Sequence, residues 1–225
     1  MKPTGLVRLL QLSDSLFPVG AYAYSEGLEA AVQARRVATA ADLDGWLTHF
    51  VRHVFVSSEG RALFQGVRAL VDDDWETLVR LDCELTALRP AAATRASSSA
   101  IGRRYLKTCV TTFDDPAFAA AESRLPDANA PVAYAVVAHC LGVAPRDAMI
   151  AFGYSRLAGC VSAALRLMPL GQQQGQIALR QAADLLPAAV DEIVAQPDAP
   201  LCSFSPGVDV CQMNHRHLYS RLFRS

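Results

Sequence analysis

Apolar residues recur at helical spacing along most of this chain. The clearest case lies in residues 43–55, where the apolar positions are Leu43, Trp46, Leu47, Phe50, Val51, Val54 and Phe55. Positions spaced in this way share one side of an α-helix, so the segment predicts a helix with a wide buried stripe. Thr39 and, three residues later, Asp42 fit a capping box at the start of that helix.

Acidic residues and prolines mark two further helices. Asp73, with Glu76 three residues later, predicts a helix start, and Pro90 predicts where that helix ends. Pro131 suits the first turn of another helix, which Gly142 closes.

The longest predicted helix begins at Pro145 and stops at Pro169. Its apolar residues surround most of the circumference, which indicates the central helix of the fold. Runs rich in Val, Ile and Thr with strict alternation, which would predict strands, are missing. Further helices are expected over residues 5–16, 24–35, 58–71, 92–112 and 173–195, the last with a break near Pro187.

These patterns predict an all-α protein, a single-domain bundle of roughly eight to ten helices. Residues 113–131 carry Asp-Asp-Pro and Pro-Asp sequences, residues 196–208 carry three prolines and a glycine, and both stretches are expected to be irregular. We assign residues 1–208 to the helical domain and residues 209–225 to a flexible C-terminal tail that binds partners. An end without a core of its own is ordered only by what it docks on.

The composition narrows the class of protein. With 225 residues, 52% of them hydrophobic, the chain can build one sizeable core. The 21 Lys and Arg against 22 Asp and Glu give a net charge of -1, which argues against nucleic acid as a partner. The six cysteines form no C-x-x-C pair, and no apolar run is long enough for a signal peptide or a membrane span. We therefore expect a soluble cytoplasmic protein with no membrane partner.

Motifs for nucleotide binding and for nucleophilic catalysis are missing or incomplete. The chain has no G-x-x-x-x-G-K-[ST] and no G-x-G-x-x-G segment, so it is not expected to bind a nucleotide by itself. Residues 23–27, Ala-Tyr-Ser-Glu-Gly, come within one residue of the G-x-S-x-G nucleophile elbow, but no strand precedes them. A helix start at Tyr24 or Ser25 is the plainer interpretation.

Two groups of residues could contact a metal ion. His49 and His53 are four apart on a predicted helix, so their imidazoles share a face, and a metal-dependent hydrolase that uses this pair is one alternative function. A structural or solvated role for the pair is the plainer interpretation. The second group matches no standard zinc module and consists of Cys202, Cys211, His215 and His217. We expect no permanently bound metal or other cofactor.

Two short segments could serve a partner. Residues 170–176 are polar, uncharged and glycine-containing, which is typical either of a bend between two helices or of a surface that offers glutamine amides. The end of the chain combines aromatic and arginine residues, the types that dominate interface hot spots. They are Arg216, Tyr219, Arg221, Phe223 and Arg224, and Leu222 lies among them.

Three separated segments resemble one family. Residues 16–29, LFPVGAYAYSEGLE, look like the L-P-V-G-[AG]-[FY]-x-Y-S-x-G-L-E signature of the urease accessory proteins known as UreF. Residues 169–176, PLGQQQGQ, resemble the L-G-Q-x-x-G-Q element of that family, and residues 219–225, YSRLFRS, are similar to its terminal motif. The resemblance covers essentially the whole chain.

The resemblance implies an all-α, cytoplasmic protein that is not an enzyme. Its implied partners are a second copy of the chain in a homodimer, a nickel-carrying accessory GTPase, a scaffold accessory protein of the UreD/UreH type and apo-urease. The assembly delivers nickel as GTP is hydrolysed, so nickel is handled in transit and is no resident cofactor. A helical ligand-binding regulator with a closed apolar pocket remains an alternative from another class.

The resemblance also assigns roles to residues. The dimer and GTPase-facing surface comprises Pro18, Gly20, Tyr24, Ser25, Gly27 and Glu29. Near that surface, or supporting it, lie Gln172 and Gln176. The partner-binding tail ends in Tyr219, Ser220, Arg221, Leu222, Phe223, Arg224 and Ser225. This tail is expected to be mobile until partners order it, and its removal is expected to leave folding unchanged.

Overall fold

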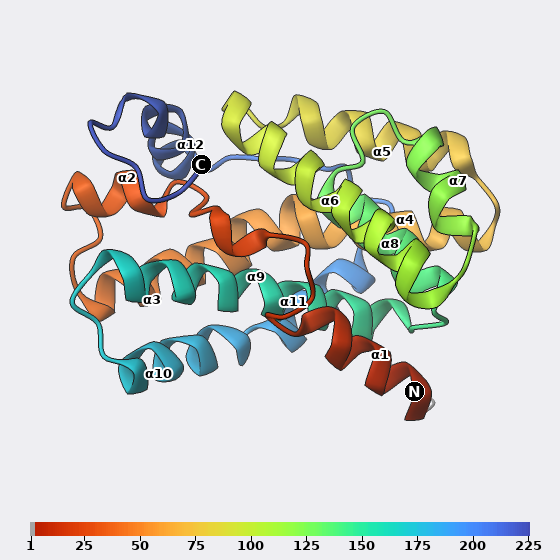
Figure 1. Cartoon of the computed structure of the whole chain (residues 1–225), viewed down its shortest axis with the longest axis horizontal. Coiled ribbons are helices and arrows are strands. Elements are labelled where there is room, and N and C mark those ends of the chain that lie inside the picture. The colour runs from red at the N-terminus through yellow and green to blue at the C-terminus, as the bar shows by residue number, and fades with distance from the viewer. Residues whose placement is uncertain (1–2) are drawn as a thin grey trace.

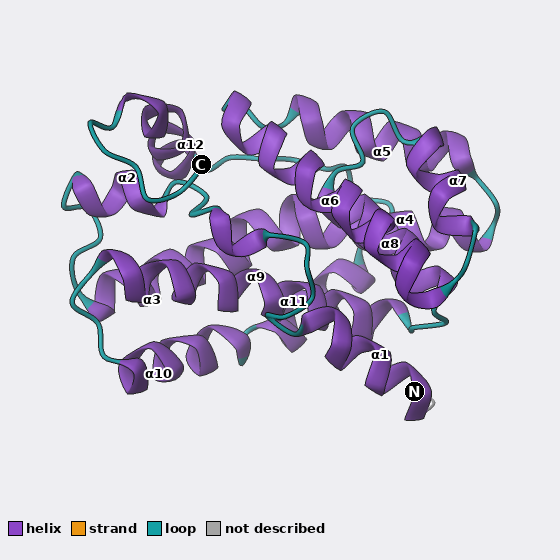
Figure 2. Ribbon diagram, in the orientation of Figure 1, coloured by secondary structure: helices purple, strands orange, loops and turns teal. Residues whose placement is uncertain are grey.

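The computed structural model describes residues 3–225, and within that range every regular element is a helix (Figures 1 and 2). The α-helices are α1 (Pro3–Ser13), α2 (Leu28–Gln33), α3 (Ala40–His49), α4 (Gly60–Val71), α5 (Trp75–Ala87), α6 (Ala92–Phe113), α7 (Ala117–Arg124), α8 (Ala130–Cys140), α9 (Pro145–Leu167), α10 (Gln172–Ala183), α11 (Leu186–Ala195) and α12 (Pro206–Asn214). A π-helix, η2 (Phe50–Glu59), and two 3-10 helices, η1 (Ala21–Ala23) and η3 (His215–His217), complete them. The prediction of an all-α single domain is confirmed.

Helix α9 forms the centre of the bundle. It packs against α1, α2, α3, α4, α8, α10 and α11 (Figure 1). Within the described residues it is the one helix long and apolar enough to cross a membrane by length and composition. Its contacts with seven other helices account for that apolar character, because a helix surrounded by neighbours needs apolar side chains on most of its circumference.

The first predicted helix is longer than its apolar stripe suggested. Residues 40–71 form a continuous helical rod in which η2 joins α3 to α4, and Gly60 at the junction keeps right-handed helical dihedrals. The capping box at its start is confirmed, since the Asp42 amide donates to Thr39 Oγ1 at 3.2 Å and the Thr39 amide donates to Asp42 Oδ2 at 2.9 Å.

The start predicted at Asp73 is wrong by one residue. Asp74 caps α5 by accepting the Thr77 amide proton at 2.9 Å, whereas Asp73 takes a left-handed conformation with φ 53°. That conformation turns the chain out of α4, and the Asp73 carboxylate instead accepts from the Trp75 indole. The helix ends at Ala87, before Pro90.

The stretch 113–131, expected to be irregular, contains α7. Phe118 and Ala121 on this helix are fully buried. A single apolar turn of this kind is too short to produce a helical period in the sequence, and packing against α6 and α8 stabilises it. The break expected near Pro187 is confirmed, because α10 ends at Ala183 and Pro187 lies in the first turn of α11.

A buried aspartate fixes the loop between α7 and α8. Asp82 on α5 is fully buried, and its carboxylate accepts backbone amides from Asp127 at 2.9 Å, Ala128 at 2.8 Å and Asn129 at 2.7 Å. The same loop presses on α6 at Gly102, where an added Cβ would collide with the Ala128 carbonyl oxygen. The loop therefore has one position relative to both helices.

Candidate docking surface

The C-terminal tail, residues 209–225, is ordered against its own chain. Figure 1 shows the dark-blue tail beside α2, and Phe223 retains only 4% of its exposed surface. Its first part lies in α12 and η3, where the sequence predicts a flexible tail. The expectation of a flexible tail is therefore corrected, because the body of the protein itself supplies the surface on which the tail docks.

Glu29 on α2 holds the middle of the tail. Its Oε1 accepts the Leu222 amide at 2.6 Å, and its Oε2 accepts the Phe223 amide at 3.2 Å and lies 2.7 Å from His215 Nε2. Glu29 is 2% exposed and His215 is 1% exposed. A buried carboxylate requires such partners, because an uncompensated charge away from water is costly. Glu29 therefore fixes the position of the tail relative to α2.

The last residue of the tail is held by a turn at the start of α2. The Ser225 backbone oxygen accepts the Ser25 amide at 2.7 Å, the Glu26 amide at 3.1 Å and the Ser25 hydroxyl at 2.7 Å. Glu26 and Gly27 have φ of 54° and 90°, and such left-handed residues turn consecutive N–H groups toward one acceptor. Ser25 contributes a hydroxyl donor to this turn, and Gly27 accommodates the left-handed conformation that the turn requires.

Further contacts join the tail to α9 and α2. The Arg166 guanidinium carbon lies 4.2 Å from the centre of the Phe223 ring, and its Nη2 donates to the Tyr22 carbonyl oxygen at 2.8 Å. Gln33 Nε2 donates to the Ser220 carbonyl oxygen at 3.1 Å. We call the exposed parts of residues 16–29 and 219–225 the tail surface.

The residues assigned from the sequence divide into two groups. On the outside, exposed to solvent, lie Pro18, Gln172, Gln176, Tyr219, Ser220, Arg221, Leu222 and Arg224. Partly or fully buried are Gly20, Tyr24, Ser25, Gly27, Glu29, Phe223 and Ser225. In this conformation the buried group shapes the tail surface and the exposed group is available to a partner.

Gln172 and Gln176 lie on α10, which packs on α3 and α9. Among residues 3–225 no hydrogen bond or ion pair joins α10 to the tail surface. Residues 168–171 form the bend between α9 and α10, and Gln174 closes the α10 start by accepting the Gly171 amide at 3.4 Å. Of the stretch 170–176, only residues 170 and 171 therefore belong to the bend, whereas residues 172–176 begin α10 and leave Gln172 and Gln176 exposed.

The sequence pattern did not identify Tyr22 as part of the tail surface, or Gln33 and Arg166 as residues that contact the tail. Arg166 lies in α9, and α10, α11 and α12 separate it from Phe223 along the chain. The helical pattern of α9 predicts only a solvent-exposed arginine at this position. Only the packing of α2 on α9 brings its guanidinium over the Phe223 ring.

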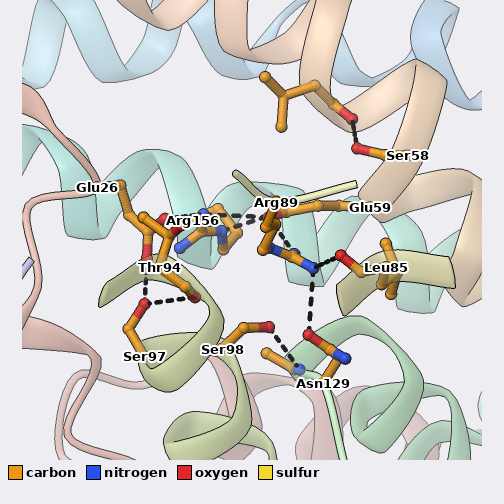
Figure 3. A network of polar contacts seen from close by, with 12 residues as sticks. Glu26, Ser58, Glu59, Leu85, Arg89, Thr94, Ser97, Ser98, Asn129 and Arg156 are labelled. Carbon is orange, nitrogen blue, oxygen red and sulfur yellow. Dashed lines mark hydrogen bonds and ion pairs between the residues drawn. The ribbon is translucent and has the colours of Figure 1, made fainter. Parts of the chain in front are cut away.

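A cavity with a charged wall lies beside the tail surface. Its volume is about 120 Å³, and Tyr24, His49 and Asp209 are among its lining residues. Figure 3 shows the charged network in that wall, in which Arg156 is central. Arg156 Nε donates to Glu59 Oε2 at 3.0 Å.

The network pairs two carboxylates, Glu26 and Glu59, with two arginines, Arg89 and Arg156. Arg156 Nη2 also lies 3.4 Å from Glu26 Oε2, and Arg89 Nη2 lies 3.2 Å from Glu59 Oε1. Burial alone raises the pKa of the Glu59 carboxyl, but the Arg156 and Arg89 guanidiniums outweigh burial and hold that pKa below its usual value. The network therefore connects Glu26, which lies in the turn that holds Ser225, to η2, α9 and the α5–α6 loop.

Of the histidine pair, His49 lines this cavity. The His49 and His53 ring centroids are 4.8 Å apart, and His49 Nε2 lies 3.0 Å from the Ser205 hydroxyl. Burial and the neighbouring His53 lower the pKa of His49, whereas burial raises the pKa of Asp209. In the described part of the chain no three His, Cys, Asp or Glu side chains are grouped so as to hold a metal ion.

The second group of possible metal ligands is dispersed. His215 contacts Glu29, and His217 Nε2 accepts from Arg216 Nε at 2.9 Å. Burial raises the pKa of the Cys211 thiol, so the thiolate that binds metals is disfavoured at neutral pH. Cys202 is exposed.

We expect nickel to bind the isolated chain only in the micromolar range or more weakly. Two imidazoles on one helix face supply half of the ligands that a tight site requires. Isothermal titration of Ni²⁺ measures this affinity, with the His49→Ala/His53→Ala double variant as control. Submicromolar binding that disappears in the control would contradict the expectation.

The comparisons with known proteins agree on one family. A family model described as UreF matches residues 37–183. The urease accessory protein UreF of Bacillus sp. (strain TB-90) is 31% identical over 224 residues, covering 98% of this chain and 99% of the relative. Those of Microcystis aeruginosa and Methylobacillus flagellatus are 34% identical over 221 residues and 32% identical over 226 residues, with coverage of at least 97% of each chain. The similarity to the Methylobacillus flagellatus protein covers the whole chain and so includes both parts of the tail surface, which the family model does not reach.

Proposed function

The chain belongs to the UreF family of urease accessory proteins, and on that premise we propose that it is a docking protein for nickel insertion into apo-urease. In this proposal it acts in the cytoplasm as a homodimer that joins a nickel-carrying GTPase to a scaffold accessory protein of the UreD/UreH type. Nickel passes through the assembled complex, and the chain keeps no cofactor of its own.

The tail surface is the observation that carries the proposal. Its inside is fixed by Glu29, His215 and Ser25, and its outside presents large side chains to solvent. Tyr219 is fully exposed, and Tyr22 and Leu222 are more than half exposed. A rigid surface with exposed aromatic, leucine and arginine side chains has the composition of a protein interface core.

The other candidate functions find less support. The family consists of accessory proteins and not of enzymes, which sets the hydrolase aside. A ligand-binding regulator would use the cavity, but the Glu59, Arg89 and Arg156 charges in its wall are already paired with one another. The chain also has no phosphate loop, so the proposed GTP hydrolysis belongs to a partner.

We expect the Tyr219→Ala/Leu222→Ala double variant to lose the complex with the accessory GTPase and scaffold while keeping its helical content. Both side chains are exposed, so their removal changes the interface more than the core. Co-purification with the two partners, with and without GTP, measures the complex, and circular dichroism measures helical content.

Val71→Ala is the matched control, because Val71 is also a largely exposed apolar residue but lies at the end of α4. Co-purification of the double variant at the wild-type level would refute the assignment of the tail surface. Absence of any complex with the wild-type chain would refute the proposed function itself.

A further inference from the structure

We propose that the tail surface and the arginines around it bind an acidic surface of a partner protein. The proposal rests on the proposed function, since it names the chemistry of the partner that the tail surface takes. Six arginines carry it, all exposed and none in an ion pair within residues 3–225: Arg36, Arg104, Arg166, Arg216, Arg221 and Arg224.

Contacts to the backbone and to the tail gather these arginines around one surface. Arg166 spans Tyr22 and Phe223, as described above. Arg104 Nη1 donates to the Val19 carbonyl oxygen at 3.4 Å, and Arg36 Nη1 lies 4.0 Å from Cys211 Sγ on α12. The remaining three stand on the tail itself. The chain just after α2, the middle of α6, the end of α9 and the tail therefore contribute positive charge around the tail surface.

Glu26 and Glu29, the two acidic residues within residues 16–29, do not neutralise this charge. Glu29 is buried and contacts His215 and two tail amides, and Glu26 pairs with Arg156 in the cavity wall. Both carboxylates are thus already paired within the protein, whereas the six arginine residues are exposed. Since the whole chain has a net charge of -1, the positive surface is local and is balanced elsewhere.

The apolar residues between the arginines favour a protein partner over a nucleic acid. Tyr22, Tyr219 and Leu222 are exposed among the guanidiniums, and arginine with aromatic residues is the enriched composition of protein interfaces. Guanidinium groups pair with carboxylates through two parallel hydrogen bonds, so an acidic surface supplies the complementary groups. A nucleic-acid-binding protein usually carries a clear excess of basic residues, which this chain lacks.

The test uses the full chain and a fluorescein-labelled poly-glutamate peptide as an acidic probe. Fluorescence anisotropy compares the wild type with Arg221→Glu/Arg224→Glu, whose side chains make no hydrogen bond in the described structure. The matched control is Arg146→Glu/Arg180→Glu, which changes the net charge equally on exposed arginines of α9 and α10. We expect the tail variant to bind the probe about tenfold more weakly and the control to bind within about twofold of the wild type.

Two results would overturn the proposal. Equal losses in both double variants would show that only net charge matters, and tighter binding of a single-stranded RNA of equal charge, lost in the tail variant, would assign the surface to nucleic acid. The same variants are then tested against the accessory partners. A partner complex that forms but does not respond to tail charge reversal refutes the acidic-surface proposal alone, whereas absence of any wild-type complex refutes the proposed function alone.

Discussion

Replacing Glu29 by alanine is expected to release the tail from α2. The change removes the acceptor of the Leu222 and Phe223 amides and leaves His215 buried without its carboxylate. Each buried N–H group that loses its acceptor in this way costs about 1–3 kcal/mol. Because the tail is held mainly by these contacts and by the Ser225 turn, we expect local release before global unfolding. Limited trypsin digestion measures it as faster cleavage after Arg216 and Arg221.

Glu192→Ala is the control for this prediction, because Glu192 is exposed on α11 and has no ion-pair partner in the described structure. Its trypsin sensitivity should equal that of the wild type. We also expect Glu29→Ala to weaken the partner complex although Glu29 is only 2% exposed, since it positions Leu222 and Phe223. A Glu29→Ala protein that resists trypsin as well as the wild type does would show that other contacts suffice to hold the tail.

Replacing Asp82 by asparagine is expected to cause the largest loss of global stability. The carboxylate accepts three consecutive backbone amides and the Asn129 side-chain amide at 3.0 Å, all away from water. An asparagine keeps the shape but turns one acceptor into a donor that faces N–H groups, which leaves buried donors unpaired at about 1–3 kcal/mol each. We expect about 3–5 kcal/mol of destabilisation in urea unfolding.

Asp72→Asn serves as the control, because Asp72 is exposed at the end of α4. Its free energy of unfolding should change by less than about 0.5 kcal/mol. The Asp82 effect should also reach the charged network, since Asn129 Oδ1 accepts from Arg89 Nη1 at 3.2 Å and Arg89 contacts Glu59 (Figure 3). A wild-type unfolding midpoint for Asp82→Asn would contradict the role assigned to this carboxylate.

The sequence alone determined the helices whose signals are local. Thr39 and Asp42 are three residues apart and cap each other, so the start of α3 could be predicted without knowledge of the fold. The central place of α9 was also predictable, because its apolar residues cover most of its circumference. The three motifs that resemble the UreF family could likewise be recognised in the sequence alone, and the comparisons confirm that family.

Where two signals competed, the tertiary structure decided. Asp73 and Asp74 are equivalent caps in sequence, and the left-handed turn at the end of α4 selects Asp74. Helix α7 has too few turns for a period, and the π-helix between Phe50 and Glu59 leaves no mark in a pattern of apolar residues. Burial of Phe118 and of Glu59 fixes these elements, and burial depends on the rest of the fold.

The tail shows the same division most clearly. Its arginine and aromatic residues identified a binding segment from composition, but composition does not say which surface is bound. The tertiary structure places Glu29 against His215 and Phe223, more than 180 positions later in the chain. A buried carboxylate must find donors wherever the fold supplies them. Local sequence therefore determined what kind of segment the tail is, and only long-range packing decided that it docks first on its own protein.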